Sequence, residues 1–358
     1  MDFAESDIFR RSSDSEGEGE AEAECATLHI HHAASTGDVQ QLVQAVQQDP
    51  SMLEQQNAEG LTPLGQAVLS QQMAAVKRLV KMGADINAQD DIGRTCLSIA
   101  AYQGWLEGVV FLLRNGARQN ICDKSGRHPI HAATYDQDVR TLVTLLQTLS
   151  LADINQQDHE QMTALHWAAF HNRPEHLKCL MDKGGNIMAH DVDGKLPLHW
   201  AAQNGSADCC RLLLTREEEA AEKMLGAQDH TGKTPLHFAA AAGHSDIIRL
   251  LAAHPHCERE AEDPDDRTPL HWAAAMGHVQ CVQTLLELGV KVTAEDADGG
   301  TPLSYASQSG HKGEADFHCL SFFPFLTCLG YYFIVPSLGN SGRFLPESSN
   351  RVQSKPPF

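Results

Sequence analysis

Thr268-Pro269-Leu270-His271 begins a phrase that returns through most of the 358-residue chain, each time just before an alanine-rich run. Clear copies start at Thr62, Thr163, Leu196, Thr234 and Thr301, and weaker ones at Leu28, Thr95 and His128. In chain order, the nine anchors are separated by 34, 33, 33, 35, 33, 38, 34 and 33 residues. This regular period indicates an array of stacked units, each too small to bury its apolar surface alone.

The residues after each anchor predict a short helix. Thr268 suits the N-cap, and Pro269 suits the first turn, where its missing amide hydrogen costs no helical bond. The small side chains of Ala273 and Ala274 allow neighbouring helices to approach closely. Gly277 then supplies the left-handed residue that ends such a helix.

A second helix is predicted in the same unit, because Val282, Leu285 and Leu286 are apolar at positions i, i+3 and i+4. A turn-rich linker follows, and it carries an aspartate at one equivalent position: Asp90, Asp123, Asp158, Asp191, Asp229, Asp263 and Asp296. The sequence therefore predicts an all-α solenoid of about nine helix-turn-helix units with β-hairpin-like linkers.

The period and the Thr-Pro-Leu-His phrase together resemble the ankyrin repeat. The stretches 49–54, 93–117, 165–172 and 265–274 are also similar to non-enzymatic vertebrate members of that family, whose relatives include inversin-like proteins tied to cilia. The resemblance covers roughly residues 26–313 and implies a protein-binding scaffold. It also implies association with the ciliary base or centrosome, and ciliary transport proteins among the partners.

Three departures from the repeat stand out. The long step after Leu196 points to an insertion at 215–222, which we expect to form a charged bulge between units. Gln137 and Asn172 replace the glycine that ends the first helix in other units. After residues 310–313 the second helix of the ninth unit is not recognisable, so that unit reads as truncated.

The two ends of the chain differ from the array. Residues 1–25 hold nine acids against Arg10 and Arg11, which predicts a disordered acidic tail in which Ser13 and Ser15 suit an acid-directed kinase. Residues 314–358 form a divergent apolar tail that we expect to be poorly ordered. Its segment 317–335 reads either as an alternative terminus or as a membrane anchor, and we favour the former because His318 and Pro324 interrupt it.

Composition narrows the class of protein. Lys and Arg total 27 against 47 for Asp and Glu, a net charge of −20, which argues against nucleic-acid binding. The 10 cysteines contain no CxxC pair, so neither a disulfide framework nor a structural zinc site is indicated. The N-terminus lacks an apolar signal. We therefore expect a monomer in the cytoplasm or nucleus, without membrane attachment.

Two stretches resemble a nucleotide-binding motif and a metal site, but neither has the required residues at the required spacing. Residues 226–234 approach a P-loop but are one residue too long and follow no strand. His254, His256 and Cys257 lack a fourth ligand. The repeat's own histidines are expected to bridge adjacent hairpins: His31, His131, His166, His199, His237 and His271. We predict no catalytic residues, no cofactor and no metal. A regulatory or adaptor subunit of an enzyme remains an alternative by analogy alone.

One column of residues, directly before the anchors of units three to eight, is mostly cationic although the protein is acidic. Met162 interrupts it, and the other five residues form what we call the cation column: Arg94, Arg127, Lys195, Lys233 and Arg267. Such a stripe suits an acidic peptide. The equal alternative is that each cation pairs with a hairpin aspartate of its own unit.

A second column follows the alanine pair. Tyr102, Tyr135 and Phe170, which we call the aromatic column, occupy it in units three to five. On the concave face of the array they would anchor a partner spread over units three to six. The alternative is packing against the next helix. The tryptophans of the anchor phrase, Trp167, Trp200 and Trp272, read as partly buried core.

Asn87 completes the set of candidate sites. Residues 79–87 resemble an ankyrin sequence that an oxygen-dependent dioxygenase hydroxylates on asparagine, and the resemblance implies Asn87 as the target. The alternative is a hairpin asparagine that only satisfies backbone groups.

Overall fold

The computed structural model of the chain describes residues 28–215 and 218–308. Ser13, Ser15, the acidic tail and the apolar segment 317–335 lie outside these ranges, so the expectations for them stay untested. Within the described ranges the secondary structure is helical, with one isolated antiparallel bridge between Gln89 and Thr95 and no longer strand. The all-α solenoid prediction is confirmed.

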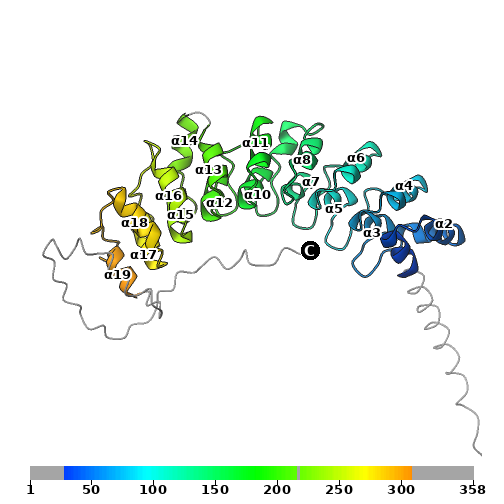
Figure 1. Ribbon diagram of the computed structural model, residues 1–358, viewed down its shortest axis with the longest axis horizontal. Coiled ribbons are helices and arrows are strands. Elements are labelled where there is room, and N and C mark those ends of the chain that lie inside the picture. The colour runs from blue at the N-terminus through cyan, green and yellow to red at the C-terminus, as the bar shows by residue number, and fades with distance from the viewer. Residues whose placement is uncertain (1–27, 216–217, 309–358) are drawn as a thin grey trace, which may run out of the picture. The chain divides into compact units, whose positions relative to one another are not determined.

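The helices form two rows (Figure 1). The first helices of successive units pack on one another in chain order. They are α3 (Pro63–Leu69), α5 (Cys96–Tyr102), α7 (Pro129–Ala132), α10 (Ala164–Phe170), α12 (Pro197–Gln203), α15 (Pro235–Ala242), α17 (Pro269–Ala275) and α19 (Pro302–Gln308). Residues 28–36 are also helical and begin the array.

The second helices make the other row, and each also packs on the first helix of its own unit or on its neighbours in the row. They are α2 (Val39–Gln48), α4 (Met73–Lys81), α6 (Leu106–Arg114), α8 (Val139–Leu145), α11 (Pro174–Asp182), α13 (Ala207–Leu214), α16 (Ser245–Ala252) and α18 (Val279–Glu287). Three short helices add to the two rows: η1 (Pro50–Glu54), α9 (Leu151–Ile154) and α14 (Glu218–Leu225).

The anchors work as the sequence predicts. Thr268 is the N-cap of α17 with Pro269 in its first turn, and Gly277 has a φ of 72°. Asn172 adopts the left-handed conformation of the glycine it replaces, with a φ of 53°. Gln137 does not, because α7 ends early and residues 133–137 form turns and bends instead.

The insertion corrects one expectation. Instead of a charged bulge, residues from 218 onward form α14, whose Ala221, Met224 and Leu225 are buried while its acidic side chains stay exposed. The segment is rich in strong helix formers, and its two glutamates in the first turn suit the positive end of the helix dipole.

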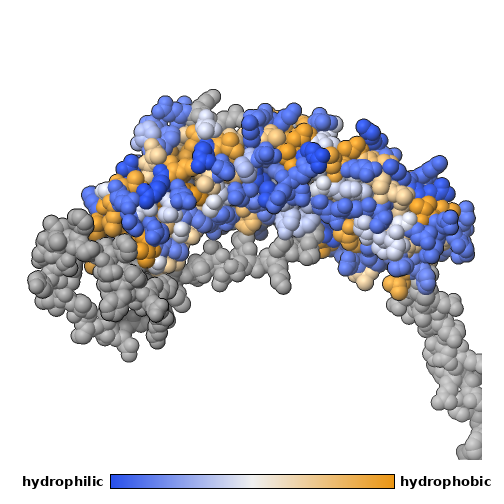
Figure 2. Space-filling model, viewed as in Figure 1, coloured by the Kyte–Doolittle hydropathy of each residue, from blue (hydrophilic) through white to orange (hydrophobic). Residues whose placement is uncertain are grey.

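The core is thin and continuous. Alanines such as Ala168 and Ala169 are fully buried between first helices, and leucines such as Leu177 and Leu180 fill the space between the rows. Outside the core, Figure 2 shows mostly hydrophilic residues with separate hydrophobic patches.

Adjacent hairpins are joined through their backbones. The amides of Lys124, His159 and Val192, for example, donate to carbonyls of the preceding hairpin at 2.9 Å. These bonds hold the hairpin tips in register from one unit to the next.

The hairpin of the fifth unit holds a strained residue. Gln161 has a φ of 56° at the position that Gly93, Gly126 and Gly194 occupy in other units. A side chain in this conformation costs about 1 kcal/mol or more. Gln161→Gly should therefore raise the free energy of unfolding by about 1 kcal/mol in urea denaturation, even though glycine adds freedom to the unfolded chain. An unchanged or lower urea midpoint would show that the strain is relieved elsewhere.

Candidate protein-interaction face

The aromatic column lies at the carboxyl ends of the first helices. Tyr102, the last residue of α5, stacks on Tyr135 of the next unit with ring centroids 4.2 Å apart. Tyr135 is 37% exposed and meets the edge of His171 at 5.0 Å. The structure therefore brings two of the three predicted anchors into direct contact.

Phe170 continues the column at the end of α10. Its ring meets Trp167 at 5.6 Å, His171 at 5.1 Å and Trp200 at 5.4 Å, each edge to face. Phe170 is half-buried, so both readings of the column are visible here: it packs on the next unit and still reaches the surface. The sequence analysis did not single out His171, which joins the tyrosines to Phe170.

Most of the cation column follows the alternative reading, because four of its five members pair within their own hairpin. Arg94 binds Asp90 at 2.7 Å, Arg127 binds Asp123 at 3.7 Å and Lys195 binds Asp193 at 3.5 Å. Arg267 binds both Asp263, at 3.0 Å, and Asp265, at 2.6 Å. In the described ranges Lys233 forms no ion pair with a carboxylate, and it alone departs from the pattern.

The equivalent aspartates organise the hairpins. The Asp191 carboxylate accepts the amides of Asp193 and Lys195 at 3.0 and 2.8 Å, and the indole N–H of Trp200 at 2.8 Å. Asp158 with Trp167 and Asp263 with Trp272 repeat the indole bond at 2.9 and 3.0 Å. The analysis missed this bond, although an aspartate and a tryptophan nine residues apart were its visible signal.

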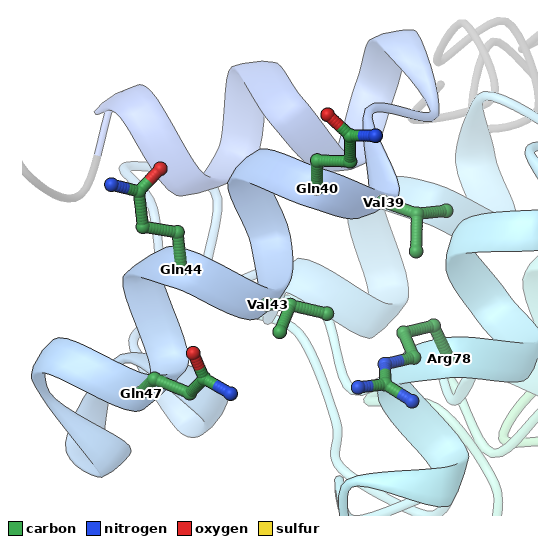
Figure 3. A pocket seen from close by; sticks show the side chains of 6 residues that line it. All are labelled: Val39, Gln40, Val43, Gln44, Gln47 and Arg78. Atoms are coloured by element: carbon green, nitrogen blue, oxygen red, sulfur yellow. The ribbon is translucent and has the colours of Figure 1, made fainter.

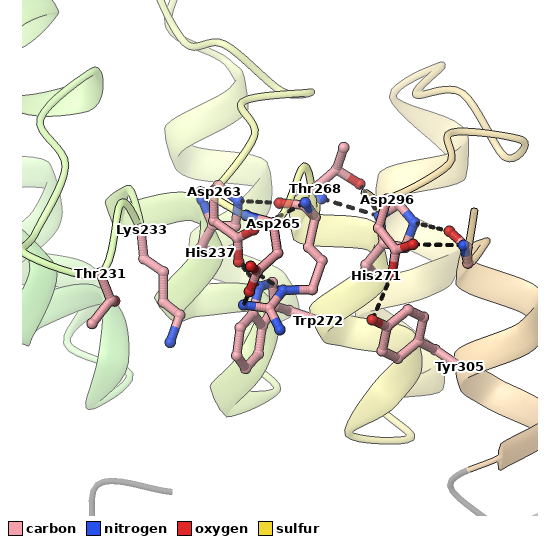
Figure 4. Close-up of polar contacts among 12 residues, drawn as sticks. Thr231, Lys233, His237, Asp263, Asp265, Thr268, His271, Trp272, Asp296 and Tyr305 are labelled. Atoms are coloured by element: carbon pink, nitrogen blue, oxygen red, sulfur yellow. Dashed lines mark hydrogen bonds and ion pairs between the residues drawn. The ribbon is translucent and has the colours of Figure 1, made fainter. Parts of the chain in front are cut away.

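Burial changes the charge behaviour of these carboxylates. It raises the pKa of Asp158 and Asp191, while the indole and amide bonds partly offset the effect. Asp296 uses the hydroxyl of Tyr305 in place of an indole, at 2.6 Å (Figure 4). Each hairpin is thus closed by a polar side chain from its own first helix or its own loop.

Cations of the column also lie over these rings. The Lys195 ammonium is 4.6 Å from the centroid of Trp200 and 5.1 Å from that of Phe238. Lys233 and the Arg267 guanidinium lie 4.1 and 4.9 Å from the centroid of Trp272. Trp167 is half-buried, as predicted for the three tryptophans, whereas Trp200 and Trp272 are buried more deeply than predicted.

The repeat histidines bridge adjacent units, as predicted. In His166 the Nδ1 atom accepts the Thr163 amide at 3.1 Å, while Nε2 contacts the Lys195 carbonyl of the next unit at 3.1 Å. The same nitrogen of the other repeat histidines contacts a backbone carbonyl of the next unit's linker at 2.8 to 3.2 Å: His31, His131, His199, His237 and His271. Burial lowers the pKa of His131, His166, His199 and His237 to about 4, and it also lowers that of His271.

Comparison with known families agrees with this geometry. The model for "Ankyrin repeats (3 copies)" matches residues 67–158, 130–225, 216–296 and 255–317. The chain belongs to the ankyrin-repeat family.

Named relatives share part of this ankyrin array. Inversin of Canis lupus familiaris is 37% identical over 202 residues, which is 56% of this chain and 19% of that protein. Inversin of Homo sapiens is 36% identical, and that of Danio rerio 37%, over the same length. The chain spans about a fifth of the length of the curated relatives it matches.

Asn87 takes a structural role in the ankyrin array. Its Oδ1 accepts the Arg118 amide of the next unit at 2.9 Å, and its own amide donates to Asp85 at 2.9 Å. This is the backbone-satisfying alternative. Asn87 is half-buried, so part of its side chain stays accessible. Hydroxylation at Asn87 is a proposal.

The stretch that approaches a P-loop and the histidine cluster at 254–257 are parts of the ankyrin array. Gly232 turns the hairpin and Thr234 caps α15. His256 faces Glu218 and Glu222 of α14 at 3.6 and 3.7 Å. Across residues 28–215 and 218–308, no group of three or more His, Cys, Asp or Glu side chains is placed to hold a metal ion.

A shallow depression lies between α2 and α4 (Figure 3). Val39 and Val43 face Arg78 across it, and Gln40, Gln44 and Gln47 border it. It contains no member of either column. Among the described helices, none has the length and apolar character needed to span a bilayer.

Proposed function

We propose that this protein is a non-enzymatic scaffold that recruits partner proteins through the first helices and hairpins of units three to six. The carrying observation is the unbroken series of ring contacts from Tyr102 through Tyr135, His171 and Phe170 to Trp200. Aromatic side chains that are partly exposed and held rigid by their neighbours are the usual anchors of protein interfaces.

The cation column supports an orienting role beside the aromatic anchors. Arg127 lies 5.4 Å from the centroid of Trp167, within the same units as Tyr135 and Phe170. Its partner Asp123 is 3.7 Å away, a loose pair that a partner's carboxylate can replace. Electrostatic pairing of this kind sets the orientation and association rate of a partner more than its affinity.

Replacing the aromatic column by alanine tests the proposal. Tyr102→Ala, Tyr135→Ala and Phe170→Ala together should abolish affinity capture of the partners that the full chain retains, because anchor residues carry most of the binding free energy. The control is Val143→Ala with Leu151→Ala, which removes exposed apolar side chains outside the column. Circular dichroism should show both variants folded. Equal capture by the triple variant and the full chain would rule out the aromatic column as the site.

Similarity also supports a place of action. The relatives named inversin support a relationship to inversin-like proteins. Residues 93–117 and 165–172 also resemble ankyrin repeat domain-containing protein 55, and a relationship to that protein is part of the proposal. We propose association with the ciliary base or centrosome, with ciliary transport proteins as partners. Hydroxylation of Asn87 and phosphorylation of Ser13 and Ser15 belong to the same proposal as modifications that would adjust it.

A further inference from the structure

The seventh unit balances its charges differently from its neighbours. In the eighth unit Asp263 accepts from both the Arg267 guanidinium and the Trp272 indole, each at 3.0 Å. In the seventh unit the position of the tryptophan is held by Phe238, which has no N–H to donate. The Thr231 hydroxyl takes its place and bonds the two oxygens of Asp229 at 2.8 and 3.0 Å.

Lys233 makes no side-chain bond to the carboxylate of its own hairpin in the part of the chain that the structure describes. Its backbone amide still donates to Asp229 at 2.8 Å, but its side chain runs to the next unit and ends beside Trp272 (Figure 4). No Asp or Glu side chain in the described ranges forms an ion pair with the ammonium. Burial lowers the pKa of Lys233, and the nearby Arg267 and Lys195 act in the same direction, while the charges of Asp229 and Asp263 raise it.

The surroundings of Lys233 suit an anion. Lys195 and Arg267 occupy the equivalent positions of the two flanking units, so three cations follow one another along the face. Lys195 pairs with Asp193, which is 60% exposed at the side chain, and Arg267 pairs both with Asp265, which is 64% exposed, and with the buried Asp263. The two exposed aspartates are open to exchange with a ligand carboxylate. The Lys195 ammonium lies 5.1 Å from the Phe238 ring centroid, and the Lys233 ammonium lies 4.1 Å from that of Trp272. Apolar rings beside a charge reduce its screening by water.

We propose that Lys233, flanked by Lys195 and Arg267, binds a carboxylate of a short acidic segment from a partner protein. The inference rests on the proposed function and adds to it a second contact point, in units six to eight. A short peptide is the fitting ligand, because a long polyanion such as nucleic acid meets the repulsion of a protein with net charge −20.

The probe is a fluorescent decapeptide of alternating Glu and Ala, compared with one of alternating Gln and Ala. Fluorescence anisotropy with the full chain at low salt should show binding of the Glu peptide. Salt at about 0.5 M should weaken this binding, because it screens the charges. Lys233→Met should weaken binding about tenfold, because one charge-assisted contact is lost while the apolar stem remains. The control Lys223→Met removes an exposed cation on α14 that pairs with Glu219, and should change binding less than about twofold.

Three results would overturn the proposal. Equal binding of the Gln and Glu peptides would show that carboxylates are not recognised. Equal weakening by Lys233→Met and Lys223→Met would reduce the effect to net charge. A large fall in the urea midpoint of Lys233→Met would make Lys233 a structural partner of Trp272, whereas an unchanged or raised midpoint supports a cation kept for binding.

One more full-length variant tests whether the protein's own acidic tail, rather than a partner protein, supplies the carboxylate. Glu→Gln at 16, 18, 20, 22 and 24 should leave the affinity for the Glu peptide unchanged. Tenfold tighter binding would identify the tail as the occupant and overturn a partner source. Loss of the peptide site leaves capture through the aromatic column intact, so failure here and failure of the proposed function are distinguishable.

Discussion

Acidification from pH 7 to 4.5 should lower the free energy of unfolding by several kcal/mol. Four of the histidines that bridge the units are buried, and burial lowers the pKa of His131, His166, His199 and His237 to about 4. In the unfolded chain a histidine titrates near 6.5. Between about pH 6.5 and 4 the unfolded state therefore binds more protons than the native state, and stability falls as the pH falls.

The slope identifies the groups responsible. Each such histidine contributes up to about 1.4 kcal/mol per pH unit in this window. Asp158 and Asp191 act in the opposite direction, because burial raises their pKa and the native state takes up their protons more readily. The net slope should therefore be smaller than the sum over the histidines.

Urea denaturation at pH 7.5, 6.5, 5.5 and 4.5, as rough set points, measures this slope. His166→Gln should reduce the slope of unfolding free energy against pH by the contribution of one histidine, because glutamine does not titrate in this range. His159→Gln is the control, because His159 is exposed and its loss should leave the slope unchanged. Stability that is constant over this range would contradict the assignment of neutral histidines to the bridges.

The second large effect concerns a hairpin aspartate. Asp191→Ala should destabilise the array by about 3–5 kcal/mol, because it leaves three donors without an acceptor: the amides of Asp193 and Lys195 and the indole of Trp200. Lys195 and Trp200 are only 5% and 4% exposed, so water cannot replace the lost carboxylate as an acceptor.

Asp208→Ala is the matched control. Asp208 carries the same charge, is 69% exposed at its side chain and pairs with Arg211 on the surface of α13. Its removal should cost less than about 1 kcal/mol. Similar urea midpoints for the two variants would mean that the Asp191 hydrogen bonds contribute little to holding the hairpin.

The parts of the structure that depend on spacing within one unit, or on the period between units, were predictable. The N-cap at Thr268, the left-handed residue at Gly277 and the bridging contact of His166 each involve fixed offsets in the sequence. The insertion was misjudged because its charges suggested a bulge. The helix-forming character of residues 218–225 and three buried apolar side chains decided otherwise.

For the cation column the sequence offered a ligand carboxylate and a hairpin aspartate of the same unit as equal alternatives. It could not decide between them, because several donors compete for each carboxylate in three dimensions. Asp263 accepts hydrogen bonds from both the Arg267 guanidinium and the Trp272 indole. Asp229 accepts from the Thr231 hydroxyl, and the Lys233 ammonium does not bind it. The aromatic column was found by its register, but His171, which completes the series of rings, follows the column by one residue and carries no repeat signal.

The closed hairpins have a consequence for how such an array grows. In the third and eighth units the cation before the anchor is neutralised by the hairpin aspartate four residues earlier, inside the same unit. A copy of either unit therefore brings its own counter-ion, and its charge needs no match from the units on either side. Duplication of such a unit lengthens the array without adding an unpaired charge, whereas a copy of the seventh unit would add Lys233, whose side chain reaches into the following unit.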